Sequence, residues 1–413
     1  MTSTASAPAP APDIDLERFD FYGPQQYEAY RWLQSEAPVY YYAPLDTWVV
    51  SRYEDVRYVG STPELFSNTG ALSLNMIRIA RLGAGNPLDR FFDKSGEMVI
   101  TLDPPRHRQI KRTLTPAFNP KAVRALADDI QQMCVDLVDS ITPGEEIDFV
   151  PRIAARLPIL VAERLLGLEG LGLEEVGRWV DALEALTRVE TVRDLEAAAA
   201  DFGTMGQVLA ETLEKKMREP GDDLFSLLLA TELDGRPLNP AVALSHVSTL
   251  ISNGGTTRAL LASSAGLLAR HPVQRGWIRE DPALLPGAIE EILRYAPPAR
   301  GFSRVVLQDT ELHGTPIKSG QHVYMLYSAA NRDPSVFADP ERFDIKRRWD
   351  QLHVSFGFGN HSCLGQPLVR LEVSAMLREL LGRFGTFELA GEGSRQPHVQ
   401  LNAWDHLPMR FSH

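Results

Sequence analysis

The sequence has few cysteines and no long hydrophobic run. Cys134 and Cys363 are the only two cysteines in 413 residues, so at most one disulfide can form and a disulfide-stabilised fold is excluded. No stretch approaches the roughly 20 apolar residues that a membrane-spanning helix needs. The N-terminal Ala/Pro stretch has neither a basic cluster nor an apolar segment, so no signal peptide or membrane anchor is predicted. Reducing, cytoplasmic conditions fit this pattern best.

Positive charge is also in short supply. Asp and Glu number 54 against 42 Lys and Arg, which gives a net charge of −12 and argues against a nucleic-acid or anionic-membrane binder. The chain lacks internal repeats, a Gly-rich dinucleotide fingerprint, and any fused flavin or iron–sulfur domain. The sequence therefore shows no motif for binding a dinucleotide or flavin of its own.

The hydrophobic pattern predicts a mainly α (α+β) protein with small antiparallel sheets. Residues 118–295 read as mostly helical, and so does the N-terminal segment 24–36. Strand-like segments are short. They comprise a hairpin at 38–42 and 47–50, two strands at 304–306 and 322–326, and a final pair around 399–402 and 408–411. We predict a disordered tail over 1–14 and a single domain over 15–413.

The stretch Phe356–Gly365 is rich in glycine and phenylalanine and contains Cys363. The amphipathic run that follows, Gln366–Leu377, predicts a helix, so the cysteine lies just before a helix N-terminus. Backbone N–H groups there favour a thiolate over a thiol. Gly359 and Gly365 remove side chains where a flat ligand would lie against the backbone. The stretch therefore predicts a socket for a metal cofactor.

The spacing Phe356-x-x-Gly359-x-x-x-Cys363-x-Gly365, with a basic residue at His361, resembles the haem-binding signature of the cytochrome P450 family. The resemblance implies haem b (iron protoporphyrin IX) with Cys363 as the axial metal ligand. It also implies the P450 fold from about residue 15 to 413, of the soluble bacterial, actinobacterial-like type.

The resemblance also implies basic partners for the two haem propionates. The segment Asp103–Arg112 is similar to the family's helix-start motif, in which a histidine and a basic residue four positions later face the propionates. Lys111 stands where arginine is usual, so a tighter role for Arg112 stays open. The residues expected to bind the cofactor are His107, Lys111, Arg304, His361, Phe356 and Gly365.

A scaffold network is implied in the same way. Glu291 and Arg294 lie three residues apart on one predicted helix, and Pro340-Glu341-Arg342-Phe343 supplies a second arginine. The resemblance implies a buried Glu291–Arg294–Arg342 network that supports the haem loop.

The helical pattern of residues 244–270 is interrupted by glycines, which ligand contact with the backbone would explain. In the family, this distal helix carries a small residue, Gly, any residue, an acid and Thr. Here Ser252 is the small residue and Thr256 the threonine, while Asn253 replaces the glycine and Gly255 replaces the acid. The residues expected to be catalytic are Thr256, Thr257, Asn253 and Gly255.

Loss of the acid would remove a proton-transfer step worth roughly 10²–10⁴-fold. Three interpretations follow. In the first, Asn253, Thr256, Thr257 or a residue from elsewhere organises a water relay and monooxygenation is ordinary. In the second, the oxidant needs less proton delivery, as with peroxide or nitric oxide plus O₂. In the third, Thr257 takes the threonine position and Thr256 the acid's, and the acid is still missing.

By analogy, the substrate lies above the haem in a mostly apolar pocket, which favours a lipophilic or aromatic small molecule. Arg78 and Arg300 are exceptions that either pair with a substrate carboxylate or extend from the pocket lip to water. The expected pocket residues are Met76, Ile77, Arg78, Ser252, Ala299, Arg300, Phe302 and Trp404.

The implied reaction is insertion of one oxygen atom from O₂ into the substrate, with electrons from NAD(P)H passed through a ferredoxin reductase and a ferredoxin. Basic residues suited to an acidic ferredoxin are Arg106, Arg108, Arg112 and Arg370. A haem-thiolate sensor without turnover is the alternative from another class. A cysteine hydrolase using Cys363 and His361 fails, because a histidine two residues away is poorly placed as a base and no orienting acid follows.

Overall fold

The computed structural model describes residues 11–81, 97–168, 172–185 and 192–413. Most of the predicted N-terminal tail, residues 1–10, lies outside the described residues. Ile14 is buried and packs with the N-terminal core cluster. Among the described residues, no helix combines the length and apolar character that crossing a membrane requires.

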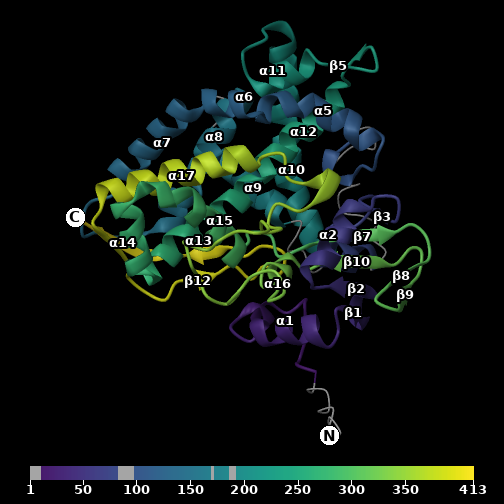
Figure 1. Ribbon diagram of the computed structural model, residues 1–413. Coiled ribbons are helices and arrows are strands. Elements are labelled where there is room, and N and C mark those ends of the chain that lie inside the picture. The colour runs from purple at the N-terminus through teal and green to yellow at the C-terminus, as the bar shows by residue number, and fades with distance from the viewer. Residues whose placement is uncertain (1–10, 82–96, 169–171, 186–191) are drawn as a thin grey trace, which may run out of the picture.

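Helices dominate the fold and small sheets lie apart from most of them, as predicted (Figure 1). The α-helices are α1 (Gln26–Ser35), α2 (Tyr53–Ser61), α3 (Leu74–Ile79), α5 (Arg106–Phe118), α6 (Pro120–Ala125), α7 (Ala127–Asp139), α8 (Arg156–Leu166), α9 (Leu173–Ala185), α10 (Val192–Arg218), α11 (Leu224–Leu229), α12 (Pro240–Ser252), α13 (Gly254–Arg270), α14 (Pro272–Glu280), α15 (Leu285–Tyr295), α16 (Tyr327–Ala330) and α17 (Gln366–Arg383). Single short turns of other helix types are η1 (Phe19–Tyr22), η2 (Ala43–Leu45), η4 (Val99–Thr101), η5 (Val150–Ala154), η6 (Pro282–Leu284) and η7 (Gly359–His361).

The largest sheet joins segments from both halves of the chain. Its strand order is β1 (Val39–Tyr42), β2 (Thr47–Val50), β10 (His322–Met325), β7 (Phe302–Val306) and β3 (Phe66–Ser67). The β1–β2 hairpin is antiparallel and confirms the predicted one, whereas β2 and β10 run parallel. Both faces of this sheet are buried, since Val49 and Tyr324 join the N-terminal core cluster and Val323 joins a second cluster.

The smaller sheets correct one prediction. The strands β11 (Thr386–Leu389), β14 (Pro408–Ser412) and β4 (Glu146–Asp148) form one sheet in that order. The remaining two-stranded pairs are β12 (Ser394–Arg395) with β13 (Trp404–His406), β5 (Glu232–Leu233) with β6 (Arg236–Pro237), and β8 (Thr310–Leu312) with β9 (Thr315–Ile317). The predicted pairing of 399–402 with 408–411 is wrong. Residue Leu401 makes only an isolated bridge to Ala299, and β14 pairs with β11 and β4 instead.

The main core is helical. Helix α17 packs against α7 and α13, and its buried residues join the largest hydrophobic cluster. Cys134 on α7 is fully buried in this cluster, as predicted for a small core residue. The predicted interruption of residues 244–270 is confirmed, because α12 ends at Ser252 and α13 begins at Gly254.

A buried ion network ties α15 to the chain that leads into the cysteine loop. Both oxygens of Glu291 bind Arg294, from Nε at 2.8 Å and from Nη2 at 2.8 Å, and both side chains are 0% exposed. The third member is Arg347, whose Nε lies 2.9 Å from Glu291 Oε2. The predicted third member, Arg342, is wrong, because its side chain is exposed and only its carbonyl accepts from Arg294.

Candidate active site and cofactor pocket

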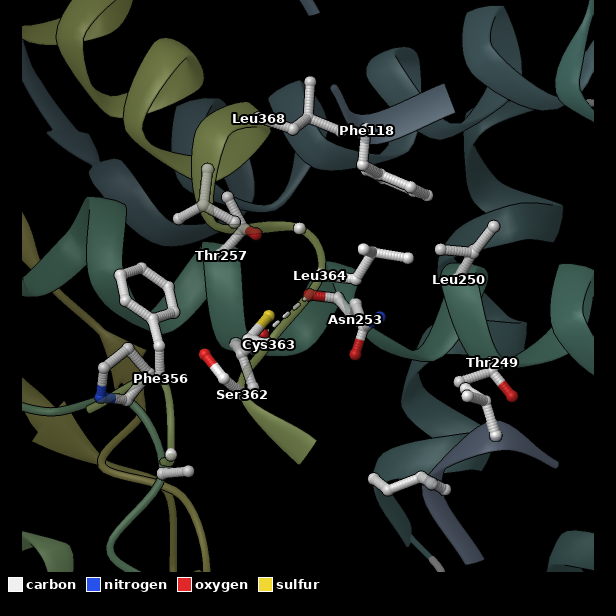
Figure 2. A pocket seen from close by; sticks show the side chains of 18 of the residues that line it. Phe118, Thr249, Leu250, Asn253, Thr257, Phe356, Ser362, Cys363, Leu364 and Leu368 are labelled. Atoms are coloured by element: carbon white, nitrogen blue, oxygen red, sulfur yellow. Dashed lines mark hydrogen bonds between the residues drawn. The ribbon is translucent and has the colours of Figure 1, made fainter. Parts of the chain in front are cut away.

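One pocket brings the cysteine loop and the interrupted helix face to face. The Cys363 side chain lines it together with Asn253 and Thr257, which are seen on either side of the cysteine in Figure 2. Figure 2 also places Phe356 and Ser362 beside the cysteine, while Thr249 and Leu250 extend the opposite wall along α12. One wall of the pocket is therefore formed by α12 and α13, and another by the loop that precedes α17.

The cysteine loop has a fixed backbone. Its Cys363 N–H donates to Phe356 O at 2.8 Å. Lys111 Nζ donates to the carbonyls of Asn360 at 2.6 Å and Ser362 at 3.1 Å. These bonds satisfy backbone groups that would otherwise face the pocket. Lys111 therefore both lines the pocket and holds the loop.

Gly359 and Gly365, the two glycines of the signature, have different surroundings. Gly359 has φ +73°, and an added Cβ would overlap the backbone of Gly60 on α2, so it permits close packing of two backbones. The expectation that Gly359 leaves room for a ligand is therefore wrong. Gly365 does line the pocket, and an added Cβ would lie 3.8 Å from Cys363 Sγ.

Burial and local donors act on the Cys363 thiol in opposite directions. Enclosure by the protein raises its pKa above the ordinary value. The backbone N–H of Gly365, the cations of Lys111 and Arg370, and the N–H of Gln366 all lower it, but burial dominates. The Cys363 side chain is exposed to the pocket, and the helix-start donors expected to favour a thiolate are in place and lower its pKa.

Basic groups gather in this pocket. His107, Lys111, Arg304 and His361 all line it, as predicted. The rings of His107 and His361 lie 3.9 Å apart. Burial, reinforced by Lys111, lowers the pKa of His107 to about 4, and burial with neighbouring cations lowers the pKa of His361 to about 2. Among the described residues, His107 Nδ1 and His361 Nε2 are buried without a hydrogen-bond partner.

This cluster fits a ligand that carries two carboxylates. Both histidines are neutral at pH 7 in the chain alone, and their unpaired ring nitrogens and the Arg304 guanidinium can donate hydrogen bonds to the two propionates of haem. Arg304 is 5% exposed, and burial lowers its pKa. Arg112, the alternative propionate partner, is exposed and does not line the pocket. The donor set therefore suits haem, with a thiol on the pocket wall for its iron.

The distal wall contains three of the four residues predicted to be catalytic. Asn253, Thr256 and Thr257 line the pocket, and Thr256 Oγ1 donates to Asn253 O at 2.9 Å. Gly255 does not line the pocket, because it is buried against α9. Ser252 also lies outside the lining, where its hydroxyl donates to Thr249 O at 2.6 Å.

Among the residues predicted for the substrate pocket, only Ala299 and Phe302 line it. Met76 and Ile77 are buried in the N-terminal core cluster instead. Trp404 is buried between two arginines, with Arg395 at 3.6 Å and Arg270 at 5.2 Å from its ring.

The two arginines predicted to anchor a substrate carboxylate bind other parts of the protein instead. Arg300 is 4% exposed, donates to His398 O at 2.6 Å and to Leu401 O, and lies 4.3 Å from the Tyr22 ring. Arg78 Nε lies 3.7 Å from the carboxylate of Glu17. Both arginines are therefore committed to protein partners, and neither lines the pocket.

Sequence reasoning missed a histidine in the pocket. His246 on α12 is 0% exposed, lines the pocket, and has no hydrogen-bond partner at either ring nitrogen among the described residues. Burial lowers its pKa to about 4, so the ring is neutral at pH 7. The spacing of His246, Thr249, Leu250, Asn253 and Thr257 follows one helix face and could have revealed it.

Comparisons with known proteins agree on one family. The sequence profile of the family described as Cytochrome P450 matches residues 279–402. The steroid C26-monooxygenase of Mycobacterium tuberculosis (strain ATCC 25618 / H37Rv) is 32% identical over 93% of this chain and 93% of its own length. The linalool 8-monooxygenase of Pseudomonas putida is 32% identical over 95% and 97%. A crystal structure of CYP109E1 from Bacillus megaterium in complex with testosterone superposes with a TM-score of 0.81 at 26% identity, covering 93% of this chain and 97% of that one.

Proposed function

The chain belongs to the cytochrome P450 family of enzymes, and on that premise we propose that it is a haem-thiolate monooxygenase in which Cys363 binds the iron. The observation that carries the proposal is the pocket itself. A lone cysteine, a cluster of buried basic groups and an interrupted helix all line the same cavity. When bound, haem supplies the activation of O₂ and the insertion of one oxygen atom into the substrate.

The chain's own residues bind and orient the cofactor. His107, Arg304 and His361 would hold the propionates, because these basic side chains line the pocket and unpaired ring nitrogens of the two adjacent histidines can donate there. Lys111 fixes the loop carbonyls and so sets the position of Cys363. Phe356, whose ring lies 4.6 Å from the Arg370 guanidinium, packs beside the cysteine.

The distal wall would order water and the substrate. Thr256 and Thr257 bring hydroxyls to the pocket, and Asn253 brings an amide at the point where α12 ends. Apolar side chains form much of the remaining wall, which favours a lipophilic or aromatic substrate. They include Leu250, Leu260, Val161, Leu165, Ala299 and Phe302.

Electrons would come from NAD(P)H through a reductase and a ferredoxin. Arg108 and Arg112 are exposed one turn apart on α5 and suit an acidic partner. Arg106 and Arg370 are weaker candidates, because Arg106 binds Glu97 and Asp234, and Arg370 binds Glu290. Burial opposes the charge on Glu290, but Arg370 and His353 hold its pKa down at about 2. We also propose a cytoplasmic location, where both free cysteines would stay reduced.

The proposal is tested with the haem-loaded chain, a bacterial ferredoxin and its reductase, NADPH and ¹⁸O₂. Linalool, testosterone and cholesterol serve as probes, because relatives of this chain are named for or bound to such terpene and steroid compounds. We expect at least one probe to gain a single ¹⁸O atom. Product with peroxide but none with redox partners would favour an alternative oxidant. Haem binding without any O₂ consumption would favour a binding protein.

His246 should favour substrates that carry one polar group on an apolar body. Its neutral ring can donate one hydrogen bond and accept another. We expect His246→Phe to weaken linalool binding by about 2- to 10-fold, the value of one neutral hydrogen bond, while the matched hydrocarbon myrcene binds equally well or better. Optical titration of the haem-loaded chain measures both affinities. Because the pKa is about 4, the preference should not change from about pH 5.5 to pH 8.

The matched control is His271→Phe, which replaces a histidine outside the pocket. It should leave the preference for linalool over myrcene unchanged. Equal weakening of both ligands by His246→Phe would contradict a hydrogen-bonding role and indicate altered pocket shape.

A further inference from the structure

A carboxylate from another helix occupies the space beside Gly255. The side chain of Glu184, on α9, is 3% exposed. A Cβ added to Gly255 would lie 2.6 Å from Glu184 Cδ and 3.0 Å from its Cγ, and it would overlap Oε1. The carboxylate therefore lies where a side chain at position 255 would begin. Gly254 and Thr256, on either side of Gly255, both line the pocket.

The same carboxylate is connected to the protein surface. Arg258 of α13 binds Glu184 Oε2 through Nη2, and Asp181 Oδ1 through Nη1 at 2.9 Å. Side-chain exposure rises along this series, from 3% for Glu184 to 11% for Arg258 and 58% for Asp181. The series thus runs from the distal helix beside the pocket to solvent.

We propose that Glu184 supplies the protons that the reaction consumes, in place of an acid at position 255. This inference rests on the proposed function. One turnover combines substrate R–H, O₂, two electrons and two protons into R–OH and water, so a largely apolar pocket needs a proton source. The Glu184 carboxylate would first take up a proton from solvent through Asp181 and then pass it to water at Thr256, which restores the carboxylate. Arg258 stays protonated and positions the two carboxylates.

This assignment explains why residue 255 is glycine. Any side chain at position 255 would collide with Glu184. A carboxylate at position 255 therefore requires a smaller side chain at position 184. The acid expected at position 255 of α13 is therefore supplied by Glu184 of the neighbouring helix α9. The interpretation that a residue from elsewhere serves the relay is favoured over an oxidant that needs fewer protons.

The experiment compares two reactions of the haem-loaded chain on whichever of linalool, testosterone and cholesterol the wild type oxidises. In the first reaction, O₂ is the oxidant and redox partners supply electrons, so two protons must enter. In the second, hydrogen peroxide brings its own oxygen, electrons and protons. We expect Glu184→Gln to lower O₂-driven product by at least about tenfold, since general acid steps contribute roughly 10²–10⁴-fold. Peroxide-driven product should stay within twofold of wild type.

The sharpest variant moves the carboxylate from one helix to the other. Glu184→Ala with Gly255→Glu should recover most of the O₂-driven product that Glu184→Ala alone loses. The matched control is Asp223→Asn, which breaks the similarly buried Lys216–Asp223 pair, with side chains 14% and 4% exposed, outside the pocket. It should change neither reaction.

A second readout needs no turnover. Gly255→Ala should lower the thermal unfolding midpoint by overpacking against Glu184, and adding Glu184→Ala should restore much of the loss. Circular dichroism of the same preparations measures both midpoints. The inference is overturned if Glu184→Gln keeps its O₂-driven product, if it loses both reactions equally, or if Glu184→Ala gives no relief to Gly255→Ala. A wild type that oxidises no probe with either oxidant would overturn the proposed function as well.

Discussion

Replacing Cys363 with serine should abolish the long-wavelength Soret band that carbon monoxide gives with a reduced, thiolate-bound haem. The serine hydroxyl occupies nearly the same space, and the backbone donors of Gly365 and Gln366 stay in place. What is lost is the sulfur ligand, which no other described residue of the pocket can supply, since Cys134 is buried in the helical core. Oxidation of the probes with O₂ should fall below detection, because the thiolate supplies the electron density that favours O–O cleavage.

Cys134→Ser is the matched control for this prediction. It also replaces a cysteine, but in the main core cluster on α7. The CO spectrum should keep its band, at a modest loss of stability because a hydroxyl replaces a buried thiol. A Cys363→Ser protein that keeps the wild-type band would refute iron ligation by this residue and the proposed function with it.

Removing Arg294 should destabilise the fold by about 3–5 kcal/mol, the usual loss when one partner of a buried ion pair is deleted. Arg294 is fully buried, binds both oxygens of Glu291, and donates to the backbone carbonyls of Asn331, Pro340 and Arg342. The variant Arg294→Leu leaves the buried Glu291 carboxylate with Arg347 as its cationic partner and the backbone N–H of Asp344 as its other donor. Urea unfolding of the haem-loaded chain, read by haem absorbance and by far-UV circular dichroism, measures the loss.

The Glu291–Arg294–Arg347 network also predicts how much stability is lost when Arg347 or Arg342 is replaced. Arg347 is 8% exposed in its side chain, binds Glu291 Oε2, and donates to Asp339 O at 3.2 Å and Arg342 O at 3.0 Å. Arg347→Gln should therefore lose about 1.5–3 kcal/mol. Arg342→Gln should change stability by less than about 0.5 kcal/mol, because its side chain is exposed and the network uses only its carbonyl. The opposite order would restore Arg342 as the third member.

Local sequence was enough to predict much of the fold. The hydrophobic period of 366–377 predicts the buried face of α17, and two β-rich runs at 38–42 and 47–50 joined by a short turn predict the first hairpin, because both signals are local. The pairing of β14 was missed for a different reason. Its partners β11 and β4 are set by distant chain segments, and a run of β-forming residues carries no information about which strand it will meet.

The site residues also fall into two groups, those marked by a local motif and those defined only by contacts between distant segments. Cys363, His107 and His361 belong to short motifs whose spacing is itself the signal, and they line one pocket as predicted. The choice between Arg342 and Arg347, five positions apart, depends on which side chain reaches Glu291 in three dimensions. Glu184 gave no signal at all, because its relation to Gly255 exists only after α9 and α13 have packed together.

The order of the main sheet has a consequence for how the protein is made. Strand β2 is complete at Val50, but its parallel neighbour β10 begins only at His322. At translation rates of about 5–20 residues per second, the ribosome needs roughly a quarter of a minute to one minute to synthesise the intervening chain. Throughout that interval the nascent hairpin has an open edge that can pair with other polypeptides.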